Sequence, residues 1–499
     1  MSRPAAGPQT IGSKQSNARG SPMHQITVNG NVRKIDYEMN ALKTGRWVEA
    51  IAVQYAACFS DPSYRSVFLS KNPDRENMLI GAVGRLIGMR VRVCRTKLEG
   101  AVDYRGETVF ACSEENEENT EGFDSLPFQK IFALCNRLMR SIKAYLPGEL
   151  QGVPFLGGVK SILLCDGPQD MVDFYLPELA VFGTEKDFRL FHAAGLPADE
   201  LLAVEPAAQV YAPPAICRRS LAPTREEYLR RMDGVMKKLK EGVIKKIIVA
   251  RKCTVETTAP FDPFGYAEYL IDRFYQEYFY LFRHGPAQQW IGITPENLFK
   301  QRGRQVITIP LAGTIRKTGD AGRDAAALGE ATPGSNLVIE HESARDFMVS
   351  QLKAANIGKV ILARSNEILE MPYAYHLMSE IHVELDETAT CFDLLAAMYP
   401  PAAVWGIPVN RIEPVIAETE PFAREFYSGL YGYWDFQGNA DIALVIRSAK
   451  LDAEDRLSVY IGSGIIDCAD PESEWAETES KMQPLVGYFA NSAACFSQE

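Results

Sequence analysis

Hydrophobic and polar positions near the middle of the chain change from helical to strand spacing. Four apolar side chains recur at helical intervals: Tyr228, Met232, Val235 and Leu239. Thr224 and Glu227 form a capping box before them and Gly242 supplies a stop after them, which predicts one amphipathic helix. The β-branched run Val243–Arg251 then predicts a strand that is buried on at least one face, and Lys246 lies inside it.

Strand and helix patterns alternate over the rest of the chain. Short β-branched or aromatic runs predict strands at Met89–Cys94, Thr108–Ala111, Ser161–Cys165, Trp290–Ile293, Val306–Pro310, Ala443–Ala449 and Leu457–Ile461. Helical spacing predicts helices at Phe128–Tyr145, at about Ser335–Ala355 and at Pro471–Leu485. The class is therefore α+β or α/β. We expect tails at 1–22 and 491–499 and two halves, 23–220 and 221–490, of one α+β fold.

Composition describes an ordinary globular protein with an acidic surface. Of the 499 residues 46% are hydrophobic and 23% are charged, enough to bury a sizeable core. The formal charge of −11 disfavours nucleic acid and membrane surfaces as partners, although one cationic pocket can still bind a small anion. The first 22 residues lack the apolar core of a signal peptide. The 10 cysteines contain no CxxC pair, which predicts free thiols and a cytoplasmic location.

The segment from Asp470 to Lys481 carries the first candidate chemistry. Asp470 as N-cap and Pro471 at the first helical position define the start of a helix. At ~100° per residue, Glu474, Glu477 and Lys481 share one face. That face is either a solvated salt-bridge strip, the commoner use of such a pattern, or a metal site. Two hard carboxylate ligands suit Mg²⁺, which takes the rest of its shell from water and an anionic substrate.

Five other polar side chains stand in partly apolar surroundings. Arg447, inside a predicted strand, needs a carboxylate partner or an anionic ligand. Lys246 in a buried strand loses hydration, as a general base near neutrality requires. Glu296 at a strand end can stay protonated and act as an acid. Glu340 and His376 are further candidates, although each of the five, taken singly, also fits a structural role.

The short stretch Gly462-Ser463-Gly464 follows a predicted strand. Its glycines let backbone amides approach an anion without obstruction by side chains. The signal is weak on its own, because many such pairs only form a turn.

Ten segments occur together in the order typical of the chorismate-utilising enzymes, and the chain resembles that family of isochorismate, salicylate, anthranilate and aminodeoxychorismate synthases. The segments are Lys246–Arg251, Gly292–Glu296, Pro310–Thr314, Glu340-His341, His376–Ser379, Gly406–Pro408, Phe426–Gly429, Ile446–Lys450, Gly462–Ile465 and Glu474–Lys481. They cover about residues 224–490. The resemblance implies one large α+β fold of two sheets packed face to face with helices outside. It also implies that 221–490 is the chorismate-binding catalytic half and that Mg²⁺ is the cofactor.

The resemblance implies a role for each matching side chain. Lys246 would activate water, Glu296 would protonate the departing C4 hydroxyl of chorismate, and His376 matches a histidine near the substrate. Mg²⁺ would be held by Glu340, Glu474 and Glu477. The implied substrate-binding residues are Gly313, Thr314, Ala403, Tyr427, Arg447, Gly462, Ser463, Gly464 and Lys481.

Lys246 bears on the nucleophile, because ammonia-using members usually have Gln at this position and water-using members have Lys. The resemblance therefore predicts water addition at C2 and an isochorismate synthase, and it leaves open whether the product serves menaquinone, siderophore or specialised-metabolite synthesis. Aminodeoxychorismate synthases often have Lys where Ala312 stands, and no glutamine amidotransferase partner is expected. Salicylate synthase, which also eliminates pyruvate, is the alternative: Ala403 and Ile446 favour isochorismate as the product, whereas Tyr427 favours salicylate. A non-catalytic chorismate-binding protein is a further alternative.

Two positions depart from the family pattern. Trp405 replaces a small residue and could reshape or gate the pocket. Leu337 stands where many relatives have an acidic side chain. We expect activity with a specificity or product that these residues can alter, in a monomer or weak dimer.

Overall fold

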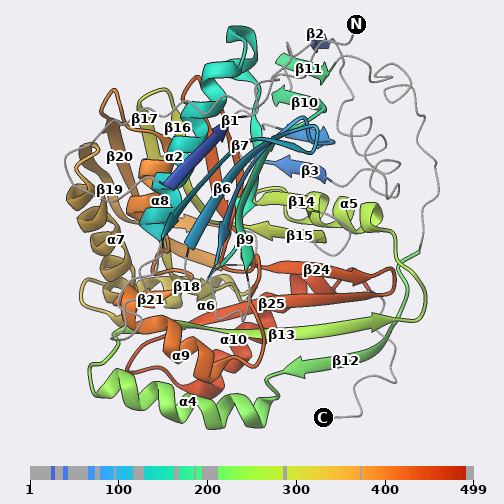
Figure 1. The fold of residues 1–499 in the computed structure, drawn as a ribbon. Coiled ribbons are helices and arrows are strands. Elements are labelled where there is room, and N and C mark those ends of the chain that lie inside the picture. Colours follow the sequence, from blue (N-terminus) through green and yellow to red (C-terminus); the bar gives the residue numbers. More distant parts are fainter. Residues whose placement is uncertain are drawn as a thin grey trace, which may run out of the picture.

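A computed structural model describes residues 24–28, 37–42, 66–72, 79–94, 97–115, 128–161, 168–184, 187–193, 212–284, 289–370 and 374–489. Two large sheets form the framework (Figure 1), and every strand pair within them that the structure describes is antiparallel. The predicted α+β class with two layers of sheet is therefore confirmed. No helix among the described residues is both long and apolar enough to cross a membrane.

The first sheet joins strands from both ends of the chain. Its order is β1 (His24–Val28), β7 (Glu107–Glu115), β6 (Lys97–Tyr104), β5 (Ile87–Val93), β9 (Gln169–Leu176), β8 (Phe155–Val159), β22 (Leu430–Trp434), β23 (Ala440–Leu444), β16 (Asn297–Arg302), β17 (Gln305–Thr308), β20 (Ala374–Leu385) and β18 (Leu311–Arg316), and β19 (Gly358–Glu370) also pairs with β20.

The second sheet also joins strands from both ends of the chain. Its order is β12 (Ile216–Ala222), β13 (Lys246–Thr257), β25 (Arg456–Ile465), β24 (Ser448–Ala453), β15 (Gln289–Thr294), β14 (Tyr278–His284), β3 (Ser66–Lys71), β4 (Leu79–Val83), β10 (Leu179–Thr184), β11 (Asp187–Ala193) and β2 (Tyr37–Leu42), and β21 (Gly406–Ile407) pairs with β13. Both sheets thus combine strands from before and after residue 220, and the predicted tails lie outside the described residues.

Aromatic side chains fill the space between the two sheets. Tyr280 of β14 and Tyr431 of β22 lie in different sheets, and their ring centroids are 4.4 Å apart. Phe68 of β3 also packs against Tyr431, at 6.4 Å. The principal hydrophobic core is continuous across this interface, so the sheets form one folded body.

Helices cover the outer faces and the ends of the sheets (Figure 1). They are α2 (Phe128–Tyr145), α4 (Arg225–Lys240), α5 (Pro263–Arg273), α6 (Ala321–Gly329), α7 (Asn336–Ala355), α8 (Cys391–Met398), α9 (Ile412–Thr419) and α10 (Pro471–Val486), with short 3₁₀ turns η1 (Gly148–Gly152) and η2 (Val409–Arg411). The capping box of α4 is present, and its four predicted apolar side chains are buried. Asp470 caps α10 by accepting a bond from the amide of Ser473.

Two predicted strands differ from the structure. The strand predicted at Val243–Arg251 begins at Lys246 and continues to Thr257. The strand predicted at Ala443–Ala449 is two strands, because β23 ends at Leu444 in the first sheet and β24 begins at Ser448 in the second. The chain therefore crosses between the sheets at 445–447.

Two more predictions concern short segments. Gly462, Ser463 and Gly464 lie within β25, so the prediction that they follow a strand is wrong. Ser161 is not in a strand, and the rest of the strand predicted at Ser161–Cys165 lies outside the described residues.

Candidate active site

A cavity of about 200 Å³ opens where the two sheets meet α7 and α10. Most of the predicted site residues line it: Lys246, Glu296, Gly313, Glu340, His376, Ala403, Tyr427, Arg447, Gly462, Ser463, Gly464, Glu474, Glu477 and Lys481. Thr314 lies beside them on β18, opposite His376 of β20. Residues spread over more than 230 positions of sequence therefore share one space, although their roles in a reaction remain predictions.

Lys246 is the first residue of β13 and is buried at the edge of the cavity. Its Nζ donates to Oε1 of Glu340 on α7, 2.8 Å away. Gly464 of the paired strand makes room for this contact, since a Cβ added there would stand 3.2 Å from Cε of Lys246. The carboxylate of Glu340, across the cavity, thus offsets the free-energy cost of burying this amine.

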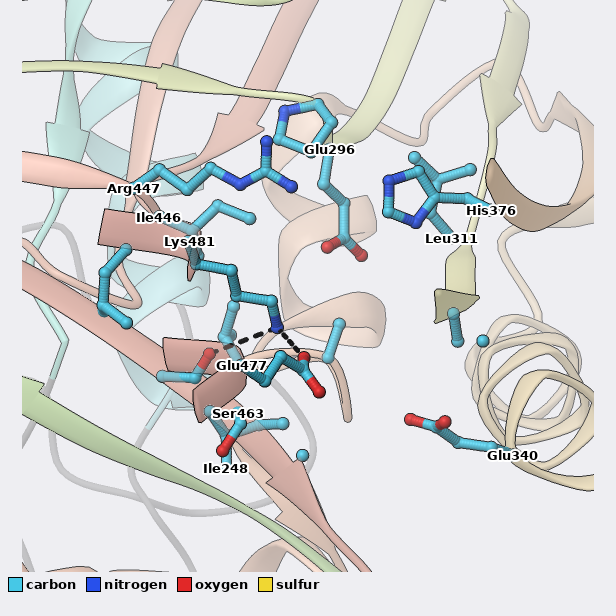
Figure 2. Close-up of a pocket in the computed structure, with 18 of the residues that line it drawn as sticks. Ile248, Glu296, Leu311, Glu340, His376, Ile446, Arg447, Ser463, Glu477 and Lys481 are labelled. Carbon is cyan, nitrogen blue, oxygen red and sulfur yellow. Dashed lines mark hydrogen bonds and ion pairs between the residues drawn. The ribbon is translucent and has the colours of Figure 1, made fainter. Parts of the chain in front are cut away.

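Glu296 follows β15 and points into the cavity between Arg447 and His376 (Figure 2). Its backbone amide donates to the hydroxyl of Thr294, 3.2 Å away. Only 9% of the residue is exposed, and burial raises its pKa to about 7. The positive charges nearby, led by Lys246, act in the opposite direction but do not cancel the effect of burial.

One face of α10 forms the side of the cavity opposite α7 (Figure 2). Lys481 pairs with Glu477 and donates to the carbonyl of Gly462, 3.4 Å away. Burial, followed by the charge of Glu477, raises the pKa of Glu474 to about 7. The sequence did not decide whether this face of α10 is a solvated strip or a metal site. In the structure, Glu474, Glu477 and Lys481 on this face line the cavity.

The carboxylates of this cavity have the chemistry that Mg²⁺ requires. Glu340 and Glu477 reach in from two different helices (Figure 2), and both Glu477 and Glu340 help to raise the pKa of Glu474. Oε2 of Glu474 is buried and has no hydrogen-bond partner among the described residues. No group of three His, Cys, Asp or Glu side chains in the described part of the chain is already gathered as a metal site. Because Mg²⁺ needs only one or two protein carboxylates besides water and substrate, the donor set fits this ion.

Arg447 lies at the crossing between the sheets, so its predicted place in a strand interior is wrong. Its backbone adopts φ 45°, and its carbonyl accepts a bond from the amide of Ile293, 3.3 Å away. Nη1 of its side chain lies 3.2 and 3.3 Å from the two carboxylate oxygens of buried Glu277, directly before β14. The guanidinium is thus both ion-paired and part of the cavity wall.

Glu277 is a residue that the sequence analysis missed. A signal was present, because this glutamate directly precedes the aromatic run Tyr278–Phe282 of a buried strand. Burial raises the pKa of Glu277 to about 7, against the opposing charge of Arg447. The structure shows it to be the carboxylate partner that Arg447 was expected to need.

His376 and Tyr427 complete the polar wall. Burial, together with the charges of Arg447 and Lys481, lowers the pKa of His376 to about 3, so its imidazole is neutral near pH 7. A Cβ at Gly462 would stand only 2.6 Å from the hydroxyl of Tyr427. Because Gly462 of β25 has no side chain, it leaves the space that the hydroxyl of Tyr427 occupies.

The two departures from the family pattern have different surroundings. Trp405 is fully buried in the cluster formed by α4, α9 and β13, and its Nε1 donates to the carbonyl of Val409, 3.1 Å away. It is not among the residues that line the cavity, so the expectation that it reshapes or gates the pocket has no support from its position. Leu337 does line the cavity, where its side chain packs against Gly313.

A sequence model of the family described as chorismate binding enzyme matches residues 172–487, more than half of the chain. The chain belongs to this family. Its curated relatives include anthranilate synthase component 1 of Haloferax volcanii, 30% identical over 265 residues (52% of this chain and 50% of the relative). Isochorismate synthase EntC of Escherichia coli K12 is 27% identical over 246 residues (49% of this chain and 62% of the relative).

Solved structures from the same family share the fold. The menaquinone-specific isochorismate synthase MenF of Escherichia coli has a TM-score of 0.68 at 18% identity, covering 91% of this chain and 95% of that one. Anthranilate synthase component I of Streptococcus pneumoniae has a TM-score of 0.63 at 19% identity, covering 82% and 92%. The chain spans about half the length of the first curated relatives it matches. Relatives with two different activities occur at similar identity, so family membership alone does not assign the reaction.

Proposed function

We propose that this chain is a Mg²⁺-dependent isochorismate synthase that adds water at C2 of chorismate and releases the C4 hydroxyl. The observation that carries the proposal is that Lys246 and Glu296 line one cavity, with burial holding Glu296 partly protonated near neutrality. An amine that can accept a proton and a carboxylic acid that can donate one are the two groups that this substitution needs.

The proton balance of the reaction assigns one transfer to each group. Lys246, in its neutral form, takes a proton from water as the oxygen bonds to C2. The two ring double bonds shift, from C1=C2 to C1=C6 and from C5=C6 to C4=C5, the bond from C4 to its oxygen breaks, and Glu296 gives its proton to the departing oxygen, which leaves as water. One water is consumed and one released, and a proton moved from Lys246 back to Glu296 restores both groups.

The positively charged side chains and the tyrosine hydroxyl of the cavity wall would bind the carboxylates of the substrate. Arg447 and Tyr427 would hold one carboxylate, and Lys481 would serve a nearby oxygen. Mg²⁺, when bound, would supply positive charge to the ring carboxylate, with Glu340 and Glu477 as its ligands and Glu474 binding directly or through water. The neutral imidazole of His376 can donate or accept a hydrogen bond at the same substrate.

Salicylate synthase is the second candidate, because Tyr427, the residue that favours it, also lines the cavity. Pyruvate elimination would follow water addition in the same space, so the two candidates share their first step. Ala403, which also lines the cavity, favours isochorismate as the product. The proposal therefore gives isochorismate as the main product.

Chromatography of the reaction products tests the proposal. We expect purified protein with chorismate and Mg²⁺ to give isochorismate, and EDTA to stop the reaction. Salicylate fluorescence without an added lyase would favour the second candidate, and anthranilate formed only with added ammonia would assign the chain to the ammonia-using relatives. No Mg²⁺-dependent loss of chorismate would leave a binding protein.

A further inference from the structure

We propose that Glu420 and Arg424, a buried ion pair behind the cavity, act as positioning residues that hold three cavity-lining segments in register. This inference rests on the proposed function for its kinetic consequence, but not for its structural one. Neither residue lines the cavity, so neither is offered as a catalytic group.

The guanidinium of Arg424 uses all three of its nitrogens inside the protein. Nε and Nη2 bond the two oxygens of Glu420, at 2.8 and 2.5 Å. The other acceptors are the carbonyl of Val404 (2.9 Å, from Nη1), the hydroxyl of Ser428 (3.1 Å, from Nη1) and the carbonyl of Ile248 (2.7 Å, from Nη2). Oε1 of Glu420 also accepts the amide of Ala250, 2.8 Å away.

Each segment reached by the pair carries a residue of the cavity wall. Strand β13, held at Ile248 and Ala250, begins with Lys246. The turn held at Val404 also carries Ala403, and Val404 itself lines the cavity. The loop held at Ser428 carries Tyr427. The guanidinium donates five charge-assisted bonds and its carboxylate partner accepts one more from the amide of Ala250, which ties the strand of the predicted base to two other cavity-lining segments.

Burial shows why this pair is better explained by geometry than by stability. The side chains of Arg424 and Glu420 are 0% and 1% exposed. Removing two charges from water costs about as much as their attraction returns, so an apolar pair of similar volume would stabilise the fold as well. Apolar side chains could not fix the directions of two backbone carbonyls and one amide. The pair is therefore suited to fixing where β13 lies relative to the Val404 turn.

Arg424→Lys tests this role, because lysine keeps the charge but has one nitrogen in place of three. We expect kcat with chorismate to fall about 10- to 100-fold, since small displacements of reacting groups have effects of this size. KM should change less than kcat, because Arg447 and Lys481 are anchored by Glu277 and Glu477. Glu420→Gln should shift kcat in the same direction.

Arg85→Lys is the matched control. Arg85 pairs with Asp173 (2.6 Å) and Asp103 (3.3 Å), and none of the three lines the cavity. This variant should leave kcat and KM within about twofold of the unaltered protein. Arg85 is partly buried, with 20% of its side chain exposed. A drop in kcat as large as that of Arg424→Lys would show a general effect of losing an ion-paired arginine and would overturn the proposal, as would an unchanged kcat in Arg424→Lys.

Hydrogen exchange supplies a readout that needs neither turnover nor a variant that folds. The amide of Ala250 donates to Glu420, and the amide of Ile248 donates to the carbonyl of Trp405. In the unaltered protein both amides should exchange far more slowly than the amides of the exposed strand β19. Arg424→Lys should speed their exchange, whereas Arg85→Lys should not. Rapid exchange of these two amides in the unaltered protein would overturn the positioning role. Slow exchange of the amides in a protein that does not convert chorismate would overturn the proposed function but leave the structural role intact.

Discussion

Replacing Glu296 with glutamine separates the cost of burying this carboxyl from its proposed role as an acid. Burial raises the pKa of Glu296 from 4.5 to about 7. Because the folded protein keeps this proton to a higher pH than the unfolded chain, ionisation of Glu296 destabilises the fold as pH rises from about 4.5 to 8. At about 1.4 kcal/mol for each tenfold change in proton affinity, the full cost is about 3 kcal/mol.

Glutamine cannot ionise, so Glu296→Gln should gain stability over the unaltered protein by an amount that grows with pH. We expect the gain to rise by about 2 kcal/mol between pH 5 and pH 8, measured by urea unfolding at constant ionic strength. Glu149→Gln, at an exposed glutamate of η1, should show no such trend. Turnover by Glu296→Gln should be lost at every pH, since an amide has no proton to give. Unfolding curves of Glu296→Gln and the unaltered protein that shift in parallel with pH would refute the argument.

Three further variants test other walls of the cavity. Lys246→Ala should abolish water addition while calorimetry still detects substrate binding with Mg²⁺, and retained turnover would assign the base elsewhere. Gly462→Ala places a methyl group 2.6 Å from the Tyr427 hydroxyl and should raise KM several-fold, whereas Gly234→Ala, with no atom within 4 Å of its added Cβ, should not. Glu277→Gln weakens a buried ion pair and should lower the free energy of unfolding by about 2 kcal/mol and raise KM; a KM equal to that of the unaltered protein would show that the arginine needs no such support.

Sequence patterns predicted the regular elements well where one signal dominates. The helix α4 has its cap, its buried face and its glycine stop within a single continuous segment, and the structure has all three. The helices α7 and α10 begin where Ser335 and Asp470 cap them. Local hydrogen bonds set these boundaries, so local sequence is sufficient to find them.

The crossing at 445–447 could not be predicted in this way. The run Ala443–Ala449 is uniformly apolar or small apart from its arginine, and a continuous strand satisfies that pattern. The break depends on two sheets that pair with its two ends, and on the bond from Ile293 to the carbonyl of Arg447. Ile293 and the paired strands β16 and β15 all lie more than 130 positions away, and periodicity within one run carries no information about them.

The cavity residues present the same contrast. The ordered segments of the family predict that Lys246, Glu296, Glu340 and Glu477 lie together, and the structure places all four in one cavity. The sequence did not predict the buried pair behind the cavity, Glu420 and Arg424. Their spacing of four positions is also that of an ordinary surface salt bridge on a helix. Burial alone distinguishes the two readings, and burial is set by tertiary packing.

Charge balance explains how two helices can present three carboxylates to one buried space. Glu340 is paired with Lys246, and Glu477 with Lys481, so two of the three negative charges are compensated by lysines that also line the cavity. The third, Glu474, has its pKa raised to about 7, so near neutrality it is about half protonated. The two lysines and the partial proton on Glu474 therefore leave these three carboxylates with only a small net charge in the absence of a ligand. A dication taken up by these oxygens would replace that proton and release the lysines, and the same two lysines would then be available for the anionic substrate and for water.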